Sequence, residues 1–75
     1  MTETAQKATI SIQVNGEPRS VSAGSTIAGM LEAIGLNPRK VAVERNLEVV
    51  PRSTLADVKV NEGDRFEIVH FVGGG

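Results

Sequence analysis

The chain has 75 residues, no cysteine and a formal net charge of −1. The absence of cysteine excludes disulfides, thiolate zinc sites and cysteine catalysis, and the small net charge gives no electrostatic argument for binding nucleic acid. No apolar run approaches the roughly 18 residues that a membrane span needs, so we expect no membrane partner.

This length predicts a single domain over residues 1–75. Residues 1–7 are polar and unpatterned, and we expect them to be mobile. They also lack the hydrophobic core of a signal peptide, which predicts a cytoplasmic protein.

The first elements form a predicted hairpin. Residues 8–14 alternate strictly between apolar and polar side chains, which is typical of a half-buried strand. Asn15-Gly16 favours a type I′ turn, and residues 17–21 return as the second strand. Pro18 has no N–H to donate, so this second strand is expected at the edge of a sheet. The residues expected to face the core from the first strand are Ile10, Ile12 and Val14.

One helix follows, with Ser25 or Thr26 as its N-cap. Gly35 is placed to end it in the left-handed conformation, and Asn37-Pro38 supports the stop. The apolar stripe of this helix consists of Ile27, Met30, Leu31 and Ile34.

The second half of the chain returns to strands. Residues 40–45 and 47–50 are predicted strands, the second of which is stopped by Pro51. Residues 53–57 resemble one helical turn with Ser53 as its cap and with Leu55 in the core. A turn-rich cluster at 61–64 precedes the final strand over 65–72.

The predicted order is β-β-α-β-β-β, which indicates an α+β protein with one helix across one face of a mixed sheet. Pairing the apolar first and last strands in parallel at the centre gives a β-grasp. If Phe66 and Ile68 face the helix, Val69 and Phe71 face the open side as a candidate docking patch. The alternative is that two exposed apolar residues on a small domain have no function.

The chain ends in Gly73-Gly74-Gly75, directly after this apolar strand. Glycine has no Cβ, so we expect a slim, flexible tail at 73–75 that suits threading a terminal carboxylate into a partner's active site. The alternative is an ordinary frayed terminus. A phosphate site is not expected here, because no helix follows the glycines.

Other candidate sites are weaker. His70 is the single histidine, but it has no evident nucleophile or orienting carboxylate, so we expect a structural or partly exposed residue. The acidic residues of the second half are dispersed, which indicates solvated surface rather than a metal site. They are Glu44, Glu48, Glu62, Asp64 and Glu67.

Several features together resemble the ThiS family of sulfur carriers in thiamine biosynthesis, which belongs to the ubiquitin-like β-grasp superfamily. They are the Asn-Gly hairpin, the segment Val49-Val50-Pro51-Arg52, the turn Glu62-Gly63-Asp64 and the ending from Ile68 to Gly75. The chain departs from the sister family of molybdopterin-synthase small subunits, because it has no proline-rich segment before its glycines. Gly73 is one glycine more than the ThiS family needs.

The resemblance implies a carrier rather than an enzyme, with no bound cofactor. A ubiquitin-activating-like adenylyltransferase would use ATP and magnesium to adenylate Gly75, and a sulfur donor such as a cysteine desulfurase would convert it to a thiocarboxylate. Thiazole synthase would then consume the sulfur. Gly73 and Gly74 would thread the tail, and Val69 and Phe71 would dock the partners. Two alternatives stay open: sulfur delivery to molybdopterin, tRNA or an amino-acid precursor, and a protein modifier or plain binding module.

Overall fold

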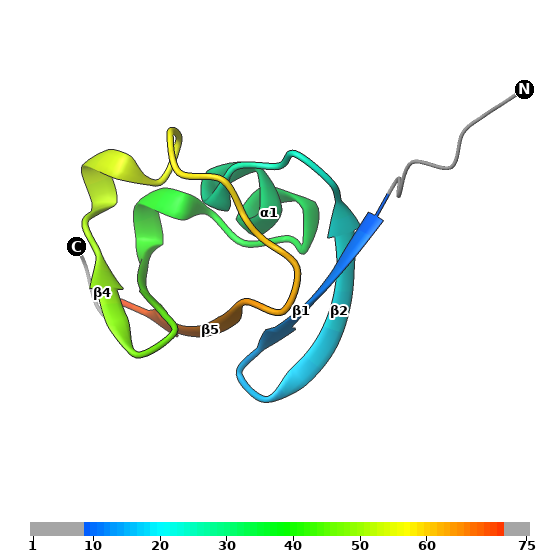
Figure 1. Cartoon of the computed structure of the whole chain (residues 1–75). Helices are drawn as coiled ribbons and strands as arrows, with labels where there is room; N and C mark the ends of the chain where they lie inside the picture. The colour runs from blue at the N-terminus through cyan, green and yellow to red at the C-terminus, as the bar shows by residue number, and fades with distance from the viewer. Residues whose placement is uncertain (1–8, 72–75) are drawn as a thin grey trace, which may run out of the picture.

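The computed structural model describes residues 9–71. Five strands form one mixed sheet in the order β2-β1-β5-β3-β4, with β1 and β5 parallel at its centre. The predicted β-grasp is therefore confirmed, and Figure 1 shows α1 lying across one face of the curved sheet. The strands are β1 (Thr9–Val14), β2 (Glu17–Ser22), β3 (Val41–Arg45), β4 (Glu48–Val50) and β5 (Arg65–His70).

The β1–β2 hairpin turns at Asn15 and Gly16, with φ of 51° and 83° as a type I′ turn requires. Asn15 also continues the central ladder after β1 has ended. Its side-chain Nδ2 donates to the Ile68 carbonyl at 3.1 Å, and its Oδ1 accepts from the Ile68 N–H at 2.8 Å. The turn therefore fastens the hairpin to β5. As predicted, β2 with Pro18 is an edge strand.

Helix α1 (Ile27–Ala33) begins at Thr26, whose Oγ1 accepts from the Gly29 N–H at 3.0 Å. The N–H groups of Ile27 and Ala28 donate to carbonyls of the crossing segment 55–58, so the first turn has its hydrogen bonds satisfied. Gly35, with φ of +91°, ends the helix as predicted, and the Leu36 N–H reaches back to the Leu31 carbonyl.

The core lies between α1 and the sheet. Ile27, Met30 and Leu31 are fully buried, and Ile34 is half-buried. The other buried apolar residues come from every strand except β4 and from the segment after it: Ile12, Val14, Val21, Val41, Val43, Leu55, Val60, Phe66 and Ile68. Within residues 9–71, no helix is long and apolar enough to cross a membrane.

Several local predictions in the second half are wrong. The predicted strands are too long at Lys40, which lies in a 3₁₀ helix, and at Phe71, which follows β5. Asn46 and Leu47 both have positive φ, 51° and 73°, so Leu47 belongs to the turn and β4 begins only at Glu48. The turn after β4 is a 3₁₀ helix, η2 (Arg52–Thr54), capped by Pro51 without any side-chain bond, so Ser53 is not its cap. Leu55 is nevertheless buried, as predicted. A further 3₁₀ helix, η1 (Pro38–Lys40), precedes β3.

Candidate docking surface and tail

The end of β5 is held on both sides until Ile68, by Asn15 on one side and by β3 on the other. Beyond β5 the Phe71 N–H donates to the Lys40 carbonyl at 2.9 Å, so a backbone hydrogen bond fixes the chain at Phe71. Gly73, Gly74 and Gly75 lie outside the described residues, as does the predicted mobile segment 1–7.

The surface of the sheet opposite α1, called the outer face below, carries several exposed apolar side chains. Val69 is 64% exposed and Phe71 is 48% exposed, which confirms that both point away from the core. Val69 lies opposite Ala42 in the β3–β5 register, and Val49 of the neighbouring strand is 74% exposed. The sequence reasoning missed Val49, because its exposure depends on β4 being an edge strand of only three residues.

Phe71 does not project freely into solvent. The guanidinium carbon of Arg52 lies 4.7 Å from the centre of its ring, a cation–π geometry. Phe71 also borders a largely apolar hollow of about 200 Å³ whose wall includes Ala42, Val49 and Pro51. Phe71, which precedes the predicted tail in the sequence, is therefore held by a backbone hydrogen bond, by its contact with Arg52 and by an apolar wall.

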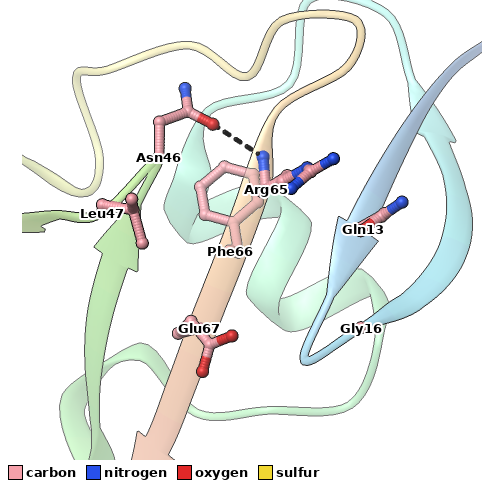
Figure 2. A pocket seen from close by; sticks show the side chains of 7 residues that line it. All are labelled: Gln13, Gly16, Asn46, Leu47, Arg65, Phe66 and Glu67. Atoms are coloured by element: carbon pink, nitrogen blue, oxygen red, sulfur yellow. Dashed lines mark hydrogen bonds between the residues drawn. The ribbon is translucent and has the colours of Figure 1, made fainter.

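A hollow of about 460 Å³ lies at the other end of β5 (Figure 2). It opens between the β1–β2 and β3–β4 turns, where the Arg65 N–H donates to Asn46 Oδ1 at 3.0 Å. Its walls mix opposite charges, Arg65 and Glu67, with the exposed Leu47. No nucleophile lines it, and it lies at the start of β5 rather than near Phe71, so we assign it no chemistry.

Asp64 is the one buried charged residue of the described chain, at 6% exposed, and its interpretation as solvated surface is wrong. Its carboxylate accepts from Arg45 Nε at 3.0 Å, from Asn46 Nδ2 at 3.2 Å and from the Asn61 N–H at 2.8 Å. These bonds join the turn before β5 to the end of β3. Asp64 is thus a structural residue that sets where β5 begins.

The other candidates form no reactive cluster. His70 is exposed at the end of β5, in a hollow shared with Glu17, Arg19 and apolar residues of the helix end. No side-chain hydrogen bond or ion pair of His70 occurs among residues 9–71. In the same range, no three His, Asp or Glu side chains are grouped closely enough to hold a metal ion.

Comparison with known proteins shows which family the sequence of this chain matches. The model of the ThiS family matches residues 12–75. A thiazole synthase from Paramagnetospirillum magneticum is 56% identical over 62 residues, which is 83% of this chain and 19% of that protein. The sulfur carrier protein ThiS of Bacillus subtilis is 42% identical over 50 residues, which is 67% of this chain and 76% of that protein.

A solved structure supports the same grouping. The crystal structure of the thiamine biosynthesis protein ThiS from Geobacter metallireducens superposes with a TM-score of 0.72 at 32% identity, covering 88% of this chain and 100% of that one. By contrast, the chain spans only about one fifth of the length of the thiazole synthases that it matches, one of which is from Magnetococcus marinus.

Proposed function

Because the chain belongs to the ThiS family, we propose that it is a sulfur carrier protein of thiamine biosynthesis and not itself an enzyme. The observation that carries the proposal is the extent of the family match, residues 12–75, which includes both the outer face and the three glycines. The name of the Bacillus subtilis relative supports the carrier role. A cytoplasmic location, expected from the sequence, belongs to the same proposal.

The proposed reaction takes place at the carboxyl group of Gly75. A carboxylate of this kind is ionised at neutral pH and is a poor electrophile, so it must first be activated. An adenylyltransferase of the ubiquitin-activating type joins it to AMP from ATP with magnesium, and pyrophosphate leaves. A persulfide sulfur from a donor such as a cysteine desulfurase displaces AMP, and a thiol reduces the remaining S–S bond to release the thiocarboxylate.

This chemistry requires no reactive side chain in the carrier. The reacting atoms are main-chain atoms of Gly75, so a chain without cysteine is able to carry sulfur. Gly73 and Gly74 supply a tail without Cβ atoms, which fits a channel too narrow for side chains and adopts positive φ where the channel requires it. Neither ATP nor magnesium is a resident group of the carrier, because both belong to the activating partner.

The outer face is the proposed docking surface, with Val69 and Phe71 as its central contacts. Ordering the tail in a channel costs about 1–2 kcal/mol for each residue that is fixed, and nearby apolar contacts are needed to offset that cost. Phe71 is well placed, because it stands two positions before Gly73 in the sequence and its ring is about half exposed. The adenylyltransferase and the thiazole synthase must receive the same short tail, so both use this one surface.

The two relatives named thiazole synthase favour thiazole synthase as the sulfur acceptor. In each of them a segment similar to this chain makes up about one fifth of a longer polypeptide. Joining in one polypeptide is expected for parts that act together. The same logic favours thiazole formation over molybdopterin or tRNA as the destination of the sulfur.

Intact-protein mass spectrometry tests the proposal. After incubation with the adenylyltransferase, ATP, magnesium and the sulfur donor, the chain should gain the mass difference of one oxygen replaced by sulfur, localised to its last peptide. Deleting Gly75 moves the carboxylate back by one residue and should abolish loading, and an added residue after Gly75 should do the same.

The matched control is deletion of residues 2–4, which removes polar residues from the other end of the chain and should leave loading unchanged. Sulfur elsewhere in the chain, or normal loading after deletion of Gly75, would refute the carrier role. Conjugates between Gly75 and lysines of other proteins, isolated from cells, would instead identify a protein modifier.

A further inference from the structure

Arg52 is the last residue of the segment Val49-Val50-Pro51-Arg52, which runs from the edge strand β4 into the 3₁₀ helix η2. Its side chain reaches the aromatic ring that stands two positions before Gly73. The guanidinium carbon lies 4.7 Å from the centre of the Phe71 ring, inside the range of about 6 Å in which a cation is attracted to the face of a ring.

The backbone is fixed on both sides of this contact. The carbonyl of Arg52 accepts from the N–H of the buried Leu55 at 3.2 Å, which ties the start of η2 to the core. On the other side, the Phe71 N–H donates to the Lys40 carbonyl at 2.9 Å. Only side-chain rotations therefore have to be ordered for the guanidinium to cover the ring, and this lowers the entropic cost of the contact.

No carboxylate of the described chain competes with the ring for Arg52. Among residues 9–71, its side chain has no hydrogen bond and no ion pair. A carboxylate within reach would draw the guanidinium to itself, because charge-assisted hydrogen bonds are strong. Arg52 is exposed, yet it lies over the ring. The Phe71 ring is therefore the contact that orients this side chain.

The contact lies on a surface that a partner is able to cover. Phe71 is 48% exposed, and it lines the hollow of about 200 Å³ together with Arg52 and the apolar Ala42, Val49 and Pro51. A cation–π contact is weak in water and becomes about two to four times stronger when water is removed from it. A partner that buries the ring therefore strengthens the contact with Arg52.

We propose that Arg52 is a positioning residue for docking on the adenylyltransferase. It holds the Phe71 ring in the orientation that this partner receives, and the pair gains strength as the partner excludes water. Arg52 thus acts through Phe71 and not through a carboxylate of the partner. The inference rests on the proposed function, in which Phe71 is a central contact of the docking surface. It assigns to Arg52 a small contribution to folding and a larger one to binding.

A double-mutant cycle tests the proposal by calorimetric titration of the full chain with the adenylyltransferase. Arg52→Gln removes the cation, Phe71→Leu removes the aromatic ring but keeps an apolar side chain, and a third variant combines the two. Arg52→Gln should lower the affinity about five- to tenfold in the wild-type background, and by less than about twofold in the Phe71→Leu background.

Kinetics of sulfur loading give a second reading of the same contact. Arg52→Gln should raise the KM of the adenylyltransferase for the carrier by a similar factor and leave kcat unchanged, because the contact contributes to binding and not to the activation of Gly75. In the free chain, the melting temperature should fall by only about 2–4 °C, because the exposed contact is weak before docking.

Arg19→Gln is the matched control. It removes the same charge from an exposed arginine of the edge strand β2, in register with the buried Ile12 and away from the outer face. The affinity of this variant should stay within about twofold of wild type.

Equal losses from Arg52→Gln in both backgrounds would show that Arg52 contacts the partner directly, and would overturn the proposal. A fall of more than about 10 °C in the melting temperature would assign Arg52 a structural role and would overturn it as well. Phe71→Ala separates the proposal from the proposed function. If that substitution weakens binding while the cycle shows no coupling, the docking surface stands and only the role of Arg52 is refuted. If it leaves binding unchanged, the docking surface and the role of Arg52 are both refuted.

Discussion

Replacing Phe71 with alanine should weaken docking strongly and folding only moderately. The ring is 48% exposed, so it contributes about half of the 1.5–3 kcal/mol that a fully buried apolar side chain of this size provides, or about 1 kcal/mol. Its exposed contact with Arg52 adds about 0.5 kcal/mol. We therefore expect a loss of about 1.5 kcal/mol, which lowers the melting temperature of a domain of this size by about 6–12 °C.

The expected loss in binding is larger. An aromatic side chain at the centre of an interface commonly contributes 2 kcal/mol or more, so the affinity for the adenylyltransferase and for the thiazole synthase should each fall by about 30-fold or more. Calorimetry measures the affinities. Urea unfolding followed by far-UV circular dichroism measures stability, because the chain has no tryptophan or tyrosine for fluorescence.

Phe66 provides the internal comparison. It lies in the same strand region but is only 1% exposed, so Phe66→Ala should cost about 3–5 kcal/mol and unfold much of the population at 37 °C. If Phe71→Ala were as destabilising as Phe66→Ala, the ring would belong to the core. If it left both affinities unchanged, the outer face would not be the docking surface.

Three further substitutions test the fold that positions this face. Asp64→Ala should lower the unfolding free energy by about 2–4 kcal/mol, because it leaves Arg45 half-buried without its carboxylate, whereas the exposed Asp57→Ala should cost less than about 0.5 kcal/mol. Asn15→Asp keeps the turn but places a carboxylate oxygen against the Ile68 carbonyl, to which Nδ2 now donates. The unfolding free energy measured in urea should fall by about 1–3 kcal/mol. An unchanged midpoint would mean that this hydrogen bond does not contribute to stability. Gly35→Ala places a Cβ on a residue with φ of +91°, and the backbone strain should lower the melting temperature by about 4–8 °C. The added Cβ would meet no atom within 4 Å, so a larger loss would show that backbone strain is not the cause.

Much of the fold could be predicted because the information is local. The alternation of β1, the Asn15-Gly16 turn and the Gly35 stop each depend on residues within a few positions, and all three appear in the structure. The wrong secondary-structure predictions also have local causes. Leu47 is an apolar residue beside an apolar strand, and nothing in its type reveals that it takes positive φ in a turn.

The contacts that shape the candidate site are long-range and could not be predicted in the same way. Asn15 bonds to a residue 53 positions away, and Asp64 bonds to Arg45, 19 positions away. Glu44 faces Glu67 only once the β3–β5 register is fixed. The exposure of Val69 and Phe71 was predictable, because strand alternation alone places them opposite the buried Phe66 and Ile68. Their role in docking stays a prediction.

The central position of β5 also has a mechanical consequence. A partner that draws on the end of the chain pulls along the axis of β5. The strand is bonded to β1 on one side and to β3 on the other, and Asn15 adds two side-chain bonds. Hydrogen bonds that lie across a strand resist such a pull together, in shear, whereas an edge strand pulled sideways would unzip one bond at a time. The domain can therefore bear traction on its last residues without being unravelled from that end.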